Sequence, residues 1–249
     1  MRQFIIFLVL IIVLVAVYQL SRLAGEWHYV VPVEPGELIY TETFDDSGAD
    51  WTLYDSNTSS TASAVNGVLR LSVGESQTLF WSQANPYFGD FDFTVEARPA
   101  ESPPTGAVYG VIFRQIDSLN FYAFFISSDG LYKIIRVNDG FRRTISNWHA
   151  VPVINQGENV VNRLRVIGYE DTFQFFINDE QVELCIPDSP DGESTPLADG
   201  ECEGGTWQTT LVDDTNAFGQ IGVVIQAEPD PDAVVDFDNI VVYGPQSIE

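Results

Sequence analysis

The sequence predicts an all-β protein, a two-sheet antiparallel jelly-roll sandwich preceded by one N-terminal transmembrane helix. Short runs of β-branched and aromatic residues recur from residue 39 onward, and Gly, Asp and Asn turn signals separate them. Apolar residues at helical spacing are absent from this part of the chain, whereas the N-terminal residues form an apolar run. About a dozen short strands with turns between them are typical of a sandwich or jelly roll.

The apolar run covers residues 4–20, FIIFLVLIIVLVAVYQL, with Arg2 before it and Arg22 after it. At about 1.5 Å rise per residue it spans about 25 Å as a helix, at the short end of what crosses a bilayer. A cleaved signal peptide is the alternative interpretation. A cut after Ala24 would place Arg22 where a small residue is required, so we favour an uncleaved anchor.

The anchor is predicted to be residues 1–24, and residues 25–38 are predicted to be a stalk with no clear periodicity. Positive charge on the N-terminal side of the run favours a cytoplasmic N-terminus. The sequence therefore predicts a single-pass membrane protein with the bulk of the chain outside the cytoplasm.

Residues 39–245 are predicted to be one domain, since β-sandwiches of this length commonly form a single unit. The chain of 249 residues is 45% hydrophobic and 13% aromatic, enough to bury a core. It carries 36 acidic against 11 basic residues, a formal net charge of −25. Phosphate binding depends on clustered Lys and Arg, so this composition excludes nucleic acid as a partner.

Two sets of hairpins are the clearest units within the domain. The phrases VYGVIFRQ, NFYAFFIS, LYKIIRV and FRRTI predict a four-strand meander with turns at Asp129-Gly130 and Asp139-Gly140. NRLRVIGY, TFQFFI and EQVELC predict a second set. The other predicted strands are LIYTETF, GVLRLSV, TLFWSQ and FDFTVEARP upstream, and GQIGVVIQA and VVDFDNIVVY at the C-terminal end.

Two cysteines, Cys185 and Cys202, bracket the Pro-, Gly- and Asp-rich segment IPDSPDGESTPLADGE. A disulfide between them would close a long loop and stabilise the fold by about 3 kcal/mol in the chain-entropy description. Two buried free thiols are the alternative. The predicted export and the position of the cysteines at both ends of one loop favour the disulfide.

The strand phrases GVIFRQIDSLNFYAFFISSDGLYKIIRVNDG, NRLRVIGYEDTFQFFINDEQV, GQIGVVI and VDFDNIVVY resemble the concanavalin-A-like lectin/glucanase superfamily, in particular its laminin-G-like jelly rolls. The resemblance implies a curved antiparallel sandwich whose concave sheet often holds carbohydrate. It suggests a non-catalytic, membrane-anchored lectin-like module. The alternatives are a structural or accessory subunit of a membrane protein complex, and a glycoside hydrolase-like enzyme.

The hydrolase alternative needs a pair of carboxyl groups, about 5–5.5 Å apart for retention or about 6.5–9.5 Å apart for inversion. The Glu-x-Asp-x-x-Glu arrangement of the glucanase relatives does not occur in this chain. Asp90, Asp92 and Glu96 share one face of a predicted strand, but Asp92 and Glu96 lie about 13 Å apart along the backbone. The sequence therefore favours binding without catalysis.

Sugar recognition combines aromatic ring faces with planar hydrogen-bonding groups, and neighbouring hairpins offer both. We expect at least some of these side chains to converge on one sheet face, with Trp81 and Tyr87 near its rim. The alternative interpretation is that the aromatic residues form the core and the arginines pair with carboxylates. The predicted glycan-binding residues are Arg114, Asn120, Tyr122, Tyr132, Arg136 and Trp148.

The sequence requires no cofactor, but it is compatible with a structural calcium ion. Jelly rolls of the resembling family sometimes hold this ion between their first and last strands, which here implies Asp236 and Asp238 with Asp45 or Glu42. A second acidic cluster, with Asp188, Asp191 and Glu193, lies in the segment between the cysteines. Solvated acidic loops are the alternative in so acidic a chain. The expected partners are therefore a membrane and either a glycan or other membrane proteins.

Overall fold

The computed structural model describes residues 7, 9–18, 28–54, 59–74, 79–101, 106–226 and 232–247. The chain divides into two units, Met1–Val30 and Val31–Glu249. Residues 9–18 of the first unit are helical, and within the described ranges no helix is both long and apolar enough to cross a membrane. Residues 1–6, 8 and 19–27, which include both ends of the predicted anchor, lie outside the described residues. Membrane anchoring therefore stays a prediction.

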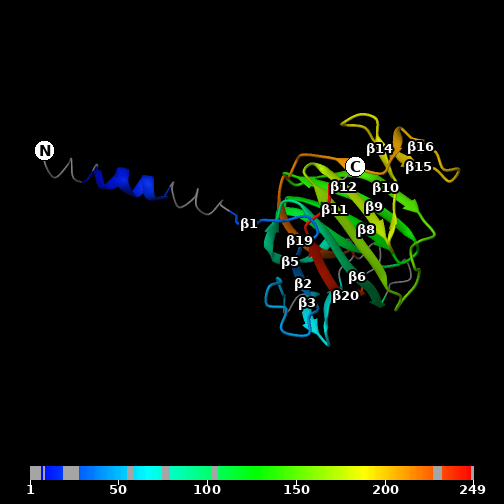
Figure 1. Ribbon diagram of the computed structural model, residues 1–249, viewed down its shortest axis with the longest axis horizontal. Helices are drawn as coiled ribbons and strands as arrows, with labels where there is room; N and C mark the ends of the chain where they lie inside the picture. Colours follow the sequence, from blue (N-terminus) through cyan, green and yellow to red (C-terminus); the bar gives the residue numbers. More distant parts are fainter. Residues whose placement is uncertain are drawn as a thin grey trace. The chain divides into compact units, whose positions relative to one another are not determined.

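The second unit is the predicted sandwich of two antiparallel sheets (Figure 1). The seven-stranded sheet has the order β1-β5-β19-β7-β8-β9-β10. Its strands are β1 (Val30–Val31), β5 (Leu79–Phe88), β19 (Gly219–Gln226), β7 (Val108–Asp117), β8 (Asn120–Ser127), β9 (Leu131–Asn138) and β10 (Phe141–Ala150).

The nine-stranded sheet has the order β13-β12-β11-β6-β20-β4-β3, with β2 beside β20 and β18 beside β12. Its strands are β13 (Glu180–Gln181), β12 (Thr172–Ile177), β11 (Asn162–Tyr169), β6 (Phe91–Glu101), β20 (Ala233–Tyr243), β4 (Val68–Val73), β3 (Ser60–Val65), β2 (Leu38–Glu42) and β18 (Leu211–Val212). Strand β3 was not predicted, because its sequence STASAV lacks the bulky β-branched and aromatic residues that mark the other strands.

The predicted meander is confirmed as β7-β8-β9-β10. The turn between β9 and β10 consists of Asp139 and Gly140, with φ of 50° and 79°. Asn178 and Asp179 connect β12 to β13 with φ of 50° and 71°. Two consecutive residues with positive φ match the type I′ turn, whose twist suits a two-residue hairpin.

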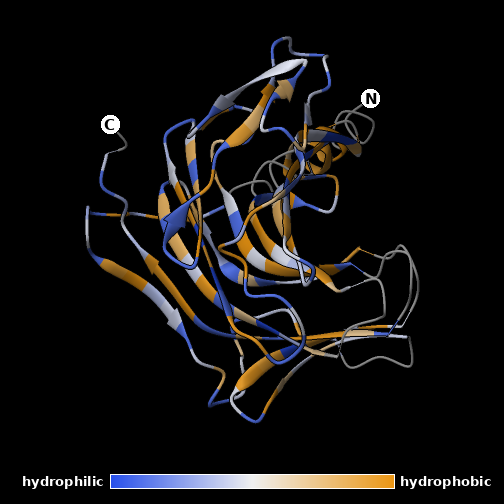
Figure 2. Ribbon diagram, turned by 90° about the vertical axis from the view of Figure 1, so that its right-hand side faces the viewer, coloured by the Kyte–Doolittle hydropathy of each residue, from blue (hydrophilic) through white to orange (hydrophobic). Residues whose placement is uncertain are grey.

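The core lies between the two sheets and is rich in phenylalanine. Along β6, Phe91, Phe93, Val95 and Ala97 are buried, as the alternation in the sequence predicts. Across the sandwich the ring of Phe124 lies 5.2 Å from that of Phe175. The alternation of apolar and polar residues along the strands is visible in Figure 2.

The predicted disulfide is confirmed, since Cys185 and Cys202 are bonded with their Cα atoms 5.5 Å apart. A plain loop was expected between the cysteines. Instead, this segment and the residues that follow it form two small antiparallel ladders. These pair β14 (Leu184–Pro187) with β17 (Gly205–Gln208) and β15 (Thr195–Pro196) with β16 (Cys202–Glu203). We call residues 184–208 the disulfide insertion. Its strands β14 and β15 contact β10, the edge strand of the seven-stranded sheet.

Candidate functional site

The outer face of the seven-stranded sheet carries a second apolar cluster, separate from the core. Its side chains come from the strands in which the sequence shows apolar residues on both faces. Aromatic residues occur at both ends of the cluster, from β5 to β10. We call this surface the aromatic face: Val108, Ile112, Phe121, Ala123, Phe125, Ile135, Val137 and Val224, with Leu79, Trp81 and Trp148 packed against them.

Strand register explains how residues far apart in the sequence meet on the aromatic face. One row runs across the sheet through Trp81, Val224, Gly110, Phe125 and Lys133, each paired with the next. Four interstrand spacings make this row about 19 Å long. Its central position is a glycine, so no side chain projects from the middle of the row.

Two half-buried tryptophans pack on a layer of buried phenylalanines, which we call the aromatic bed. Phe121 and Phe125 are 2% and 1% exposed, whereas Trp81 and Trp148 remain partly accessible. The ring of Trp81 lies 5.8 Å from that of Phe121, and the Lys133 ammonium lies 5.4 Å above the Trp148 ring. Packing against the bed fixes both indole rings, which reduces the entropy lost when a ligand covers them.

Amide side chains border this face near Trp81. Gln83 lies two residues beyond Trp81 on the same side of β5, and Gln115 pairs with Gln220 in the next strands. The Oε1 atoms of Gln83 and Gln115 are buried, and neither has a hydrogen-bond partner among the described residues. A buried acceptor without a partner costs about 1–3 kcal/mol, and a ligand hydroxyl could remove this cost once the side chain turns its oxygen toward the surface.

The chemistry of this surface suits binding. Aromatic rings present faces to C–H groups, and amide oxygens accept hydrogen bonds from hydroxyl groups. The row from Trp81 to Lys133 contains no carboxylate, whereas glycoside hydrolysis ordinarily requires two. The row can therefore hold a polyhydroxylated ligand but offers no acid–base pair.

The structure places Arg114 in the core, away from the aromatic face. Its side chain is 1% exposed and donates to the carbonyl oxygens of Asn216 and Glu170, each at 2.9 Å. Burial lowers the pKa of Arg114 from its ordinary value, although nearby Asp90 opposes this effect. Arg114 was expected among the binding residues, but its contacts are those of a structural residue.

Tyr122 and Arg136 meet Asp213 on the core side of the sheet. The Tyr122 hydroxyl donates to Asp213 at 2.7 Å, and Arg136 donates to the same carboxylate at 2.5 Å and to Thr215 at 2.7 Å. Burial raises the pKa of Tyr122 well above its usual range, and the bond to Asp213 raises it further. These two residues hold the segment before β19 against β8 and β9.

Tyr132 and Asn120 also have structural contacts, and only Trp148 of the six predicted residues lies on the aromatic face. Tyr132 is 1% exposed and donates to the carbonyl oxygen of Glu183. Asn120 lies at the β7–β8 turn, where it donates to Asp117 at 3.0 Å and accepts from the Asp139 amide at 2.9 Å. The six predicted glycan-binding residues therefore do not share one surface.

Sequence reasoning missed Gln83, Gln115 and Gln220, although a signal was present. Gln83 follows Trp81 at a spacing of two in TLFWSQ, which places both on one face of a strand. The position of Gln115 depends on a β-bulge in β7, which the sequence does not reveal. Trp81, expected at a rim, lies in the row itself.

The residues proposed for calcium do not form a ligand set. Asp236 accepts hydrogen bonds from Arg70 at 2.6 and 2.9 Å and from Arg98 at 2.7 Å. Asp45 accepts from Thr43, and Asp238 accepts from the Asn239 amide. No group of three or more His, Cys, Asp or Glu side chains within the described part of the chain could hold a metal ion. This donor arrangement does not fit Ca²⁺.

Asp236 is expected to make the free energy of unfolding depend on pH in the acidic range. Burial favours its neutral form, but the hydrogen bonds and charges of Arg70 and Arg98 outweigh burial and lower the pKa of Asp236 below 3.8. A lowered folded-state pKa stabilises the fold above the ordinary value, and this stabilisation disappears as the pH falls through the lowered value. Asp236→Asn should reduce the free energy of unfolding by about 1–2 kcal/mol at pH 7, because both arginines are partly solvated.

The check is urea unfolding of the wild type and Asp236→Asn between pH 7 and pH 2. The two curves of stability against pH should converge below about pH 4. A constant difference across the whole range contradicts the role of the charge.

The three carboxylates considered for hydrolysis each have a structural partner. Asp90 accepts from the Glu170 amide at 2.8 Å, and Glu96 accepts from Asn239 at 2.9 Å. Asp92 accepts two hydrogen bonds from Arg165, both at 2.6 Å. All three lie on β6 or its start, away from the aromatic face.

Neither a protein-family model nor a curated protein matches the sequence. Solved structures do match the fold. A carbohydrate binding module from Bacillus subtilis aligns with a TM-score of 0.55 and 15% identity over 78% of this chain and 95% of that chain. A Bacillus subtilis protein of unknown function with a galectin-like fold aligns with a TM-score of 0.54 and 16% identity, over 86% of this chain and 98% of that chain.

A Bacillus licheniformis beta-glucanase aligns with a TM-score of 0.52 and 11% identity, over 84% of this chain and 99% of that chain. Identities this low establish the fold and not the activity. The strand order and these alignments agree that the chain has a jelly-roll sandwich fold, as these solved structures do.

Proposed function

We propose that this chain is a non-catalytic carbohydrate-binding module that binds a glycan across the aromatic face. The observation that carries the proposal is the pair of half-buried tryptophans, Trp81 and Trp148, fixed on a buried phenylalanine bed beside unpartnered amide oxygens. The proposal includes the N-terminal anchor, which would hold the module at the outer side of a membrane.

The two tryptophans of the aromatic face offer apolar area to a ligand. The phenylalanines of the aromatic face are already buried, whereas Trp81 and Trp148 stay partly exposed, so a ligand that covers the two indole rings removes apolar area from water. A sugar offers C–H groups for the indole faces and hydroxyl groups for Gln83 and Gln115. That a carbohydrate binding module has the same fold supports this assignment.

The absence of catalysis rests on the carboxylates. The row across the aromatic face has none, and Asp90, Asp92 and Glu96 are engaged by Glu170, Arg165 and Asn239. A hydrolase would need two carboxyl groups facing one glycosidic bond. These contacts favour binding over hydrolysis.

Binding should be measured with the full chain in detergent on a glycan array and by retention on insoluble polysaccharides. Trp81→Ala and Trp148→Ala are each expected to weaken binding about tenfold, which corresponds to about 1.4 kcal/mol of lost contact. The matched control is Tyr243→Ala, which removes a 42% exposed aromatic side chain from the nine-stranded sheet.

The control should bind like the wild type. Wild-type protein that retains no glycan, or tryptophan variants that bind as strongly as Tyr243→Ala, would refute the proposed function.

A further inference from the structure

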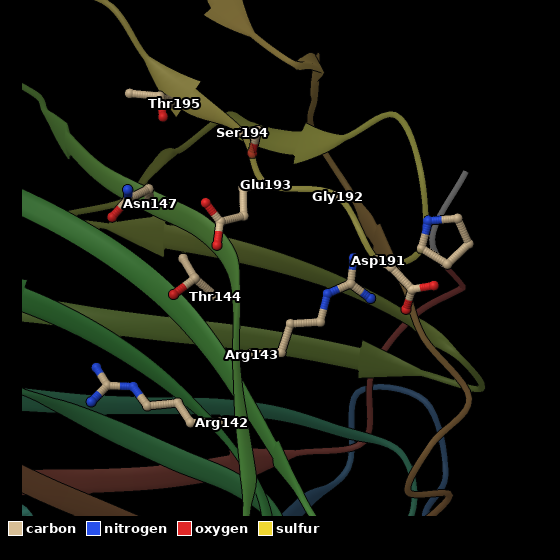
Figure 3. Close-up of a pocket in the computed structure, with 10 residues that line it drawn as sticks. Arg142, Arg143, Thr144, Asn147, Asp191, Gly192, Glu193, Ser194 and Thr195 are labelled. Atoms are coloured by element: carbon tan, nitrogen blue, oxygen red, sulfur yellow. The ribbon is translucent and has the colours of Figure 1, made fainter.

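A hollow of about 410 Å³ lies where the edge strand β10 meets the disulfide insertion (Figure 3). Arg142, Thr144 and Asn147 line it from β10. Asp191 and Glu193 line it from the insertion. The volume is that of a small-molecule site, and the lining is polar.

The wall that the insertion contributes is fixed by covalent and hydrogen bonds. The Cys185–Cys202 disulfide joins its strands β14 and β16. The buried Ser194 hydroxyl donates to the carbonyl oxygen of Cys185 at 2.6 Å, and the Cys185 amide donates to the Ser146 hydroxyl of β10 at 3.1 Å. The hollow is therefore preorganised, which lowers the entropy cost of binding.

The hollow is continuous with the aromatic face. In the ladder between β9 and β10, Arg142 pairs with Val137 and Thr144 pairs with Ile135. Both partners belong to the aromatic face, and residues directly opposite each other in a ladder share a face. Asn147 precedes Trp148 in the chain. The hollow therefore lies close to the Trp148 end of the aromatic face.

The charges around the hollow are balanced and separated. Arg142, Arg143, Asp191 and Glu193 all line it, although the whole chain has a net charge of −25. Within the described residues, no ion pair involves Arg142, Asp191 or Glu193. Groups of opposite charge thus line one space without a direct ion pair between them in the described part of the chain.

Such a lining fits the hydroxyl groups of a neutral sugar. Each hydroxyl can donate to a carboxylate and accept from a guanidinium, and hydrogen bonds to charged groups are the strong ones. A charged sugar would be attracted by one pair of side chains and repelled by the other. The geometry therefore favours a neutral ligand.

We propose that this hollow is an end subsite, which binds the terminal residue of a neutral glycan chain whose other residues lie on the aromatic face. The inference rests on the proposed function. The insertion contacts β10, the edge strand at this end of the sheet, and the glycan chain would end there. The protein would then bind one end of each glycan chain rather than any internal stretch.

The test uses calorimetry of the full chain with cello-, xylo-, laminari- and manno-oligosaccharides of two to six residues and with the parent polysaccharides. For the oligosaccharides that bind, Arg142→Ala and Glu193→Gln should each lower the affinity about tenfold. The stoichiometry should stay at one protein per glycan chain as the chain lengthens. Matched controls are Arg163→Ala and Glu180→Gln, which remove the same charges from the nine-stranded sheet.

The outcomes separate the two proposals. If Trp81→Ala loses binding while Arg142→Ala and Glu193→Gln bind like their controls, the end subsite is refuted and the proposed function stands. A stoichiometry that rises with chain length refutes the end subsite as well. If the wild type binds none of these sugars, both proposals fail.

Discussion

Replacing Arg114 by alanine is expected to lower the free energy of unfolding by about 3–5 kcal/mol. The side chain is 1% exposed, so its removal opens a cavity in the core. The carbonyl oxygens of Asn216 and Glu170 lose their guanidinium donors. The guanidinium carbon also lies 5.2 Å from the Phe173 ring and 5.8 Å from the Phe91 ring, and these contacts disappear.

Urea unfolding followed by tryptophan fluorescence measures the loss. Arg114→Met retains an apolar stem between the rings but leaves both carbonyl oxygens without a donor, so it should be destabilised less than Arg114→Ala. Arg142→Ala, which removes an exposed arginine, is the control and should change stability by less than about 0.5 kcal/mol. A loss below 1 kcal/mol for Arg114→Ala contradicts the structural role given to this residue.

Removing the disulfide is expected to cost about 3 kcal/mol of stability, because the bond joins residues 17 apart and restricts the unfolded chain. The double variant Cys185→Ser/Cys202→Ser should show this loss in thermal or urea unfolding. It should also weaken oligosaccharide binding to the level of Arg142→Ala, since the wall with Asp191 and Glu193 loses its covalent tie.

Reduction supplies the control for this prediction. Dithiothreitol should reproduce the stability loss in the wild type and have no effect on the double variant. A wild type that keeps its stability after complete reduction, confirmed by thiol titration, contradicts the assigned contribution of the disulfide.

The strands and turns of the sandwich were predictable because each follows from local chemistry. The alternation in FDFTVEAR identifies the buried side of β6, and Asp139-Gly140 provides the positive φ angles of the β9–β10 turn. The pairing of Cys185 with Cys202 followed from their positions at the ends of one polar segment. Short-range patterns carried all three predictions.

The positions of the binding candidates were not predictable, because strand alternation does not say which face is the core. Tyr122 and Tyr132 lie on the core face of their strands, one residue from side chains on the aromatic face. Arg114 has φ of 50° at an irregularity in β7, which turns its side chain toward the core beside Phe113. A bulge of this kind reverses the faces of the residues that follow it.

The sequence by itself determined an acidic all-β sandwich with a four-strand meander and one disulfide, since hydrophobic period, turn residues and cysteine spacing are properties of neighbouring residues. Only the tertiary structure decided that Trp81 and Trp148 share one outer face, that Asp236 binds two arginines, and that the insertion encloses a polar hollow. Those outcomes depend on register and sheet order, which bring together residues as far apart as Arg70 and Asp236. Which distant strands pair depends on contacts across the whole sheet, and the pattern within one strand does not specify its neighbour.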